Sequence, residues 1–162
     1  MTTLDTRGYD ETFSDNGQPV GPIPLSKLVA KYPRMRPPII GGLLRAGETM
    51  NVVAAPKAGK SWLTAGLALS IATGRNWLNT FQCVPGKVLI IDGELHGETI
   101  AHRIPAVAEA MGIDPGYFDG IDVWALRGTG TNMFDLGRRL SVIKPEQYAL
   151  ILLDAWYRFL PS

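Results

Sequence analysis

Residues 54–61 have the types and spacing of a phosphate-binding loop. They read Ala-Ala-Pro-Lys-Ala-Gly-Lys-Ser, and Gly59, Lys60 and Ser61 match the end of the pattern G-x-x-x-x-G-K-[ST]. In such a loop, consecutive backbone N–H groups surround the phosphates, the lysine reaches the β- and γ-phosphates, and the hydroxyl ligates Mg²⁺. We therefore predict that the chain binds a nucleoside triphosphate, ATP, together with Mg²⁺.

The match is incomplete at its first position, where Ala54 replaces glycine. The added Cβ is tolerated if the backbone φ angle stays negative there. A simpler interpretation is that Lys60 and Ser61 only begin an ordinary helix. The predicted nucleotide contacts are Ala54, Ala55, Pro56, Lys57, Ala58, Gly59, Lys60, Ser61 and Trp62.

A strand and a helix have to position this loop. Residues 50–53 are rich in β-branched and apolar residues after a turn, and they predict a short strand. After the loop, a largely apolar helical run ends at Gly74. The start of that helix would present unpaired N–H groups and the positive end of its dipole to the phosphates.

A carboxylate is needed on the Mg²⁺ side of the site, and Asp154 is the candidate. It follows the apolar run 150–153, so it should emerge at the carboxyl end of a core strand, where open α/β sheets bind ligands. The alternative is that Asp154 only begins a turn after the strand.

Hydrolysis also needs a group that takes a proton from the attacking water. Ala155 follows Asp154, which argues against an Asp-Glu pair, whereas Glu94 follows the predicted strand 87–91. We assign Glu94 as the catalytic base and Lys60 as the catalytic cation. Asp92 and Glu98 are alternative bases, and Asp92 or Glu94 could instead cap the next helix.

The remaining pattern alternates strands with helices. We expect strands at 87–91, 121–126 and 148–153, with helices at 96–111 and 133–143 between them. This order predicts an α/β fold of three layers, with a mostly parallel sheet. Residues 1–19 are polar and without a period, and 23–32 could form a short helix.

Composition narrows the class of protein. Of the 162 residues, 46% are hydrophobic and 19% are charged, as in a soluble globular domain. The net charge of +1 gives the chain no overall positive electrostatic field that would attract nucleic acid. No apolar run approaches the ~20 residues of a membrane span, and no signal peptide is visible, so we expect a cytoplasmic protein without membrane contact. Cys83 is expected to be a small buried or half-buried hydrophobe, and two histidines predict no Cys/His metal cluster.

Three motifs together resemble the RecA-like ATPases of the RepA replicative-helicase type, related to KaiC and DnaB. They are PKAGKSWL at 56–63, VLIIDGE at 88–94 and LILLDAWYRF at 150–159. The resemblance implies that Lys60 and Ser61 bind Mg-ATP, that Glu94 is the base and that Asp154 supports Mg²⁺. It also implies a homo-oligomeric ring such as a hexamer. In such a ring, ATP lies at the subunit interfaces and an arginine or lysine from the neighbouring subunit completes the site. DNA is an expected partner of that family that the residues of this chain do not reveal.

The family pattern continues further than this chain, which ends at Ser162. We therefore expect a RecA-like domain truncated at its C-terminus over residues 36–162, after a disordered or loosely packed arm over 1–35. The leading hypothesis is the ATPase domain of a replicative helicase or recombination motor of plasmid, phage or bacterial origin. The alternatives are a nucleotide-binding regulatory or assembly module that does not hydrolyse ATP, a fragment of a larger ATPase, and a small-molecule kinase, which the lack of a lid-like run of arginines disfavours.

Overall fold

The computed structural model describes residues 21–160, so the arm expected over residues 1–19 lies outside the described residues. The chain divides into two compact units, Met1–Met35 and Arg36–Ser162. In the first unit, helix α1 (Leu25–Lys31) confirms the helix predicted within 23–32. It ends one residue before Tyr32, because the proline that follows disfavours a helical conformation there.

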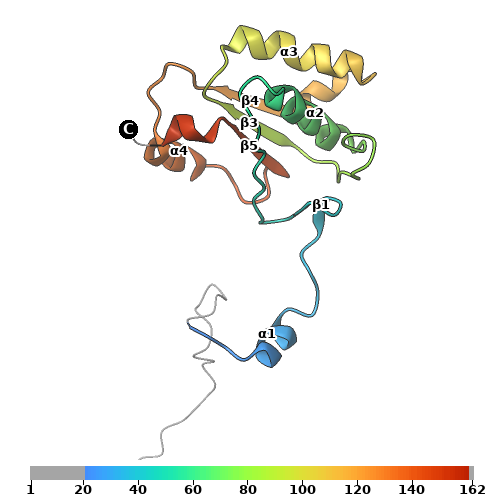
Figure 1. Cartoon of the computed structure of the whole chain (residues 1–162), viewed down its shortest axis with the longest axis vertical. Helices are drawn as coiled ribbons and strands as arrows, with labels where there is room; N and C mark the ends of the chain where they lie inside the picture. Colours follow the sequence, from blue (N-terminus) through green and yellow to red (C-terminus); the bar gives the residue numbers. More distant parts are fainter. Residues whose placement is uncertain (1–20, 161–162) are drawn as a thin grey trace, which may run out of the picture. The chain divides into compact units, whose positions relative to one another are not determined.

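The second unit is built on a parallel sheet of three strands (Figure 1). Strand β3 (Val88–Asp92) lies in the centre, with β4 (Ile121–Ala125) on one side and β5 (Leu150–Asp154) on the other. The predicted α/β class and the three predicted strands are confirmed, with small differences at their ends. Helix α3 (Gly97–Ala110) and the 3-10 turn η1 (Pro115–Gly120) connect β3 to β4, and α4 (Met133–Leu140) connects β4 to β5.

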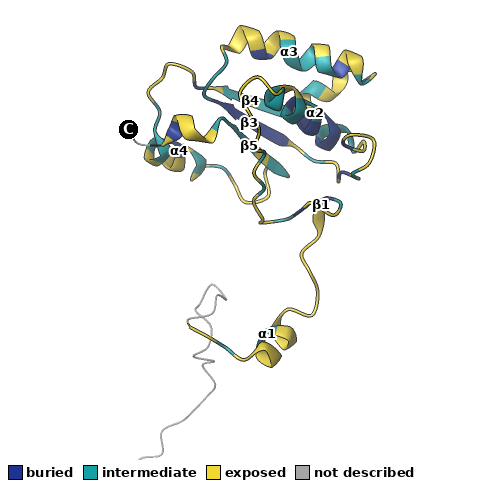
Figure 2. Cartoon of the chain, viewed as in Figure 1, coloured by how far each residue is buried: buried dark blue, intermediate teal, exposed yellow. Residues whose placement is uncertain are grey.

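Both faces of β3 are covered, which gives the unit its three layers. All five residues of β3 are buried (Figure 2). Val88 and Ile90 pack in a cluster with helix α2 (Lys60–Thr73), whereas Leu89 and Ile91 pack on the opposite face with α4 and the 3-10 turn η2 (Trp156–Phe159). A continuous apolar run is what a parallel strand buried on both faces requires.

Helices α2 and α3 pack against each other. Leu69 of α2 and Ala108 of α3 belong to one buried cluster. The predicted end of α2 at Gly74 is confirmed, since this residue caps the helix with a left-handed φ of 73°. The guanidinium of Arg75 then donates to the carbonyl oxygens of Met111 (2.6 Å) and Gly112 (3.0 Å), which ties the end of α2 to the end of α3.

The prediction of a strand over residues 50–53 was wrong. The two short strands before the loop are β1 (Pro38–Ile40) and β2 (Leu44–Arg45), which pair with each other in an antiparallel ladder. Residues 50–53 have no ladder partner in the described part of the chain, and Val53 is 90% exposed. β-branched residues favour an extended chain, but a strand also needs a neighbouring edge with which to form hydrogen bonds.

Cys83 is buried, as predicted, and it lies beside Ile40 through an isolated antiparallel bridge. Burial raises the pKa of its thiol, and a backbone hydrogen bond offsets part of that rise. Among the described residues, no helix is both long enough and apolar enough to cross a membrane.

A polar cluster lies near the starts of the three strands, at the edge of the sheet opposite the phosphate-loop motif. The ammonium of Lys87 lies 2.8 Å from Oδ2 of Asp122, and the hydroxyl of Tyr148 donates to the same oxygen at 2.5 Å. The ammonium also lies 5.7 Å from the centroid of the Tyr148 ring. The hydrogen bonds from Lys87 and Tyr148 hold the pKa of Asp122 below its usual range.

Replacing Asp122 by Asn should therefore lower thermal stability in a pH-dependent way. Because the folded pKa is lowered, the carboxylate stabilises the fold above its unfolded pKa of about 3.9, and this contribution is lost as the pH falls through the folded pKa. The groups are partly exposed, so we expect Tm to fall by only a few degrees at pH 7. Thermal melts of Asp122→Asn, with exposed Glu109→Gln as control, test this. An equal deficit at pH 7 and pH 3 would contradict it.

Candidate functional site

The phosphate-loop residues end at an open helix terminus. Gly59 is the N-cap of α2 and has a left-handed φ of 86°, which glycine adopts without a steric cost. No side chain caps the helix at this position. Within the described residues, the N–H groups of Lys60 and Ser61 donate to no protein acceptor. The start of α2 therefore presents unpaired donors, as anion-binding helix termini do.

Lys60 folds back over its own loop. Its ammonium donates to the carbonyl oxygens of Ala54 (2.9 Å) and Ala55 (3.1 Å). Lys57 has a positive φ of 63°, whereas Ala54 does not, so the condition for replacing the first glycine of the motif is met. The side chain of Lys60 thus spans the loop that the sequence motif defines.

The carboxyl ends of β3 and β5 are adjacent. Asp92 and Asp154 are register partners at the ends of their strands, and the N–H of Gly93 donates to the carbonyl oxygen of Asp154 at 2.7 Å. Asp154 is the last residue of β5, at the strand end where the sequence places it. The peptide bond after Asp154 is cis.

A pocket of about 40 Å³ lies between these strand ends and the start of α2. The structure brings Ser61 and Asp154 together in its wall, and Asp92 lines the same pocket. Lys60 and Glu94 are not among the lining residues. Both predicted metal ligands therefore line one pocket, whereas neither residue of the predicted catalytic pair does.

Asp92 builds the turn that follows β3. It is only 3% exposed, and its Oδ1 accepts hydrogen bonds from the N–H groups of Glu94 (2.8 Å) and Leu95 (2.7 Å). The alternative interpretation, in which Asp92 or Glu94 only caps the next helix, is wrong, because α3 begins after His96 without a side-chain cap. Burial raises the pKa of Asp92, these two hydrogen bonds oppose the rise, and the nearby charges of Asp154 and Glu94 add to it.

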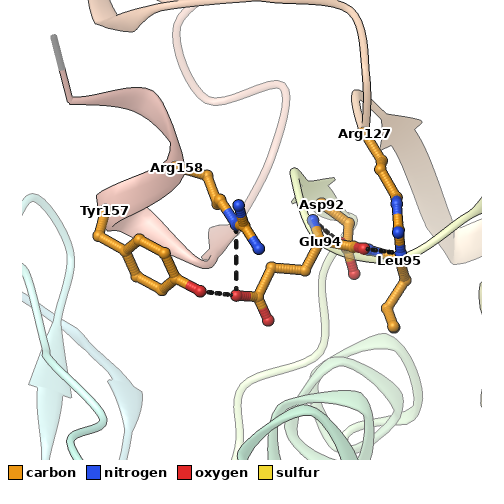
Figure 3. A network of polar contacts seen from close by, with 6 residues as sticks. All are labelled: Asp92, Glu94, Leu95, Arg127, Tyr157 and Arg158. Carbon is orange, nitrogen blue, oxygen red and sulfur yellow. Dashed lines mark hydrogen bonds and ion pairs between the residues drawn. The ribbon is translucent and has the colours of Figure 1, made fainter. Parts of the chain in front are cut away.

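Glu94 takes part in a network that the sequence did not reveal (Figure 3). The hydroxyl of Tyr157 donates to its Oε1, and Nε of Arg158 lies 3.6 Å from the same oxygen. From the loop after β4, Arg127 donates to the backbone carbonyl oxygen of Glu94 at 2.8 Å. A tyrosine and an arginine directly after the strand that ends at Asp154 could have signalled these contacts, but only once β5 was known to lie beside β3.

Trp62 and Arg103 form a second contact near the loop. The guanidinium of Arg103, on α3, lies 4.9 Å from the centroid of the Trp62 ring, a distance typical of cation–π pairs. Arg103 also lines the pocket, and Trp62 is half exposed. Direct contact of Trp62 with a nucleotide stays a prediction.

Comparison with known proteins agrees with this geometry. A helix-terminal phosphate loop beside a strand-end carboxylate is typical of the P-loop class of nucleotide-binding proteins. A family model described as AAA domain matches residues 22–160 of the 162, so the chain belongs to this AAA domain family of P-loop ATPases. No curated protein is similar enough to the chain to count as a match. The family confirms the predicted P-loop ATPase class, although not the narrower helicase type.

Replacing Asp92 by Asn should leave the fold as stable as the wild type, or more stable, at pH 7. A carboxyl whose pKa is raised in the folded state favours folding while protonated, and it loses that contribution as the pH rises through the folded pKa. An Asn can keep the acceptor for both N–H groups without the buried charge, so its advantage should shrink below about pH 4.

Urea unfolding at pH 7 and pH 4 measures this difference. Asp92→Ala is the matched control, because it removes the acceptor and should cost about 1–3 kcal/mol. If Asp92→Asn is destabilised as much as Asp92→Ala, the buried charge itself stabilises the turn and the expectation is wrong.

Proposed function

We propose that residues 36–162 carry an ATP-binding, Mg²⁺-dependent ATPase domain. The observation that carries this proposal is the pocket that both Ser61, at the start of α2, and Asp154, at the end of β5, line. Hydroxyl and carboxylate oxygens are the ligands that Mg²⁺ prefers. Within the described residues, no cluster of three or more His, Cys, Asp or Glu could hold a metal ion alone. This suits Mg²⁺, which usually takes one or two protein ligands and completes its shell with phosphate oxygens and water.

The loop fits a triphosphate for independent reasons. Unpaired N–H groups at Lys60 and Ser61 would surround phosphate oxygens, and the ammonium of Lys60 already lies over the loop. Lys60 would contact the β- and γ-phosphates, and the other residues from Ala54 to Trp62 would complete the cradle. Mg²⁺ bound between Ser61 and Asp154 would neutralise charge on the phosphate oxygens.

Glu94 is the proposed base. It follows β3 at the same sheet edge as Asp154, on the turn that Asp92 holds. From there its carboxylate would take the proton of the attacking water. This assignment requires the side chain to reach the pocket, whose wall it does not form in the structure.

The biological setting that we propose is a RecA-like motor of the RepA type, a replicative helicase or recombination ATPase of plasmid, phage or bacterial origin. Its support is the resemblance of three motifs, which contain Ser61, Glu94 and Asp154, together with the AAA family match. Such a motor would act on DNA as a homo-oligomeric ring. ATP hydrolysis with and without single-stranded DNA, and sedimentation with and without ATP, test these two points.

A second candidate is a nucleotide-binding regulatory or assembly module. The observation that favours it is that the carboxylate of Glu94 is bonded to Tyr157 and lies outside the pocket. Tight ATP binding without turnover in the wild type would select this candidate over the motor.

Lys60→Ala should weaken ATP binding by about 10- to 100-fold. The change removes the cation that faces the phosphates, and with it the charge-assisted hydrogen bonds from the lysine to the phosphate oxygens. Fluorescence titration with a labelled ATP analogue measures the Kd. Exposed Lys144→Ala is the matched control and should bind as the wild type does. An unchanged Kd in Lys60→Ala would mean that the loop is misassigned.

Glu94→Gln should leave the Kd for ATP unchanged and slow hydrolysis by about 100-fold or more, the contribution of a positioned base. Steady-state phosphate release measures the rate. Glu98→Gln tests the alternative base, an exposed residue of α3, and should hydrolyse ATP normally. A loss of turnover in Glu98→Gln or Asp92→Asn, with Glu94→Gln active, would move the assignment to that residue.

A further inference from the structure

The carboxylate of Glu94 points toward the turn after β5, where its oxygen Oε1 receives two partners (Figure 3). The hydroxyl of Tyr157 donates to Oε1, and Nε of Arg158 lies 3.6 Å from it. The pocket between Ser61 and Asp154 is lined without Glu94. The side chain is therefore held on one side of the site and absent from its wall.

In this position the carboxylate of Glu94 cannot act as a base on a water in the pocket. A base needs a free lone pair within about 2.6–3.2 Å of the proton that it takes. The O–H bond from Tyr157 and the guanidinium of Arg158 hold Oε1 at the turn after β5, and Glu94 does not line the pocket, so its side chain has to turn before it can meet a water there. The other charged groups near Glu94 are Asp92, which repels its charge, and Arg127, which is bonded to its carbonyl oxygen.

The contact is built into the packing of the turn η2. Phe159 is buried in the core, whereas Tyr157 is 58% exposed. Gly93 lets the end of β3 approach η2 closely, because a Cβ at this position would lie 3.0 Å from Cζ of Phe159 and 3.1 Å from Cβ of Arg158. The buried ring fixes η2 in place, and the exposed side chains beside it meet Glu94 at the surface, where water can replace them without unfolding the core.

We propose that Tyr157 and Arg158 are positioning residues that hold Glu94 away from the pocket, and that their contact has to open before Glu94 can act. The proposal rests on the proposed function, in which Glu94 is the base. Tyr157 and Arg158 follow Asp154 by three and four residues, so a ligand that moves the end of β5 also moves this contact. The same strand end would then carry a metal ligand and control the base.

Tyr157→Phe tests the proposal, since it removes the hydroxyl and keeps the ring. The kcat for ATP should rise by about 3- to 10-fold, the net effect of losing one ordinary hydrogen bond, while the Kd for ATP stays within about twofold. Arg158→Gln should also raise kcat. The exposed residues Tyr117 on η1 and Arg139 on α4 supply the matched controls, Tyr117→Phe and Arg139→Gln. The gain from Tyr157→Phe has to vanish in a Glu94→Gln background.

A fall in kcat, or no change, in Tyr157→Phe would overturn the proposal, since the contact would then support the base or do nothing. A gain that persists in the double variant would overturn it as well. Failure of the proposed function would look different. The wild-type protein would then not bind ATP, or its ATP binding would be unchanged in Lys60→Ala.

The contact itself can be measured without turnover. The hydrogen bond to Glu94 raises the pKa of the Tyr157 phenol. NMR titration of ¹³C-labelled tyrosines, assigned with Tyr157→Phe, should show this pKa move down in Glu94→Gln, because the neighbouring negative charge is gone. If no tyrosine changes its pKa, the contact does not exist in solution and the proposal is wrong, whether or not the protein hydrolyses ATP.

Discussion

The burial of β3 on both faces is the constraint on which the site depends. Val88 and Ile90 pack toward α2, while Leu89 and Ile91 pack toward α4, so the strand cannot shift by one residue without exchanging its two faces. Each fully buried Ile or Leu side chain contributes about 1.5–3 kcal/mol, which makes such a shift costly. With β3 fixed, its parallel pairing sets the carboxyl ends of β3 and β5 side by side.

Most of the helices and strands could be predicted from the sequence, because apolar runs and their periods report burial directly. Residues 88–92 show this best, since a run without alternation indicates a strand covered on both faces. The failure at residues 50–53 has a physical reason. Propensity describes a single segment, whereas a strand depends on an edge supplied by another part of the chain, and the order β4-β3-β5 was not readable from local patterns.

In the site, too, the features set by a contiguous motif could be predicted, whereas contacts between residues far apart in the sequence could not. The roles expected of Lys60 and Ser61 follow from a contiguous motif, and their surroundings are set by the start of one helix. The partners of the Glu94 side chain lie more than sixty residues along the chain, in a turn that only the adjacency of β3 and β5 brings near. The alternative of a helix cap at Asp92 fails because Asp92 instead builds the turn that separates β3 from α3.

Three carboxylates gather at this edge of the sheet, and the structure treats each one differently. Asp92 is buried and accepts two backbone hydrogen bonds, and Glu94 is held by a phenol and a guanidinium. Among the described residues, no hydrogen bond or ion pair engages the side chain of Asp154, which lines the pocket beside Ser61. Its charge also raises the pKa of Asp92. A divalent cation at Asp154 would weaken this repulsion, so the proposed metal site and the turn that carries the proposed base are coupled through the electrostatics of one sheet edge.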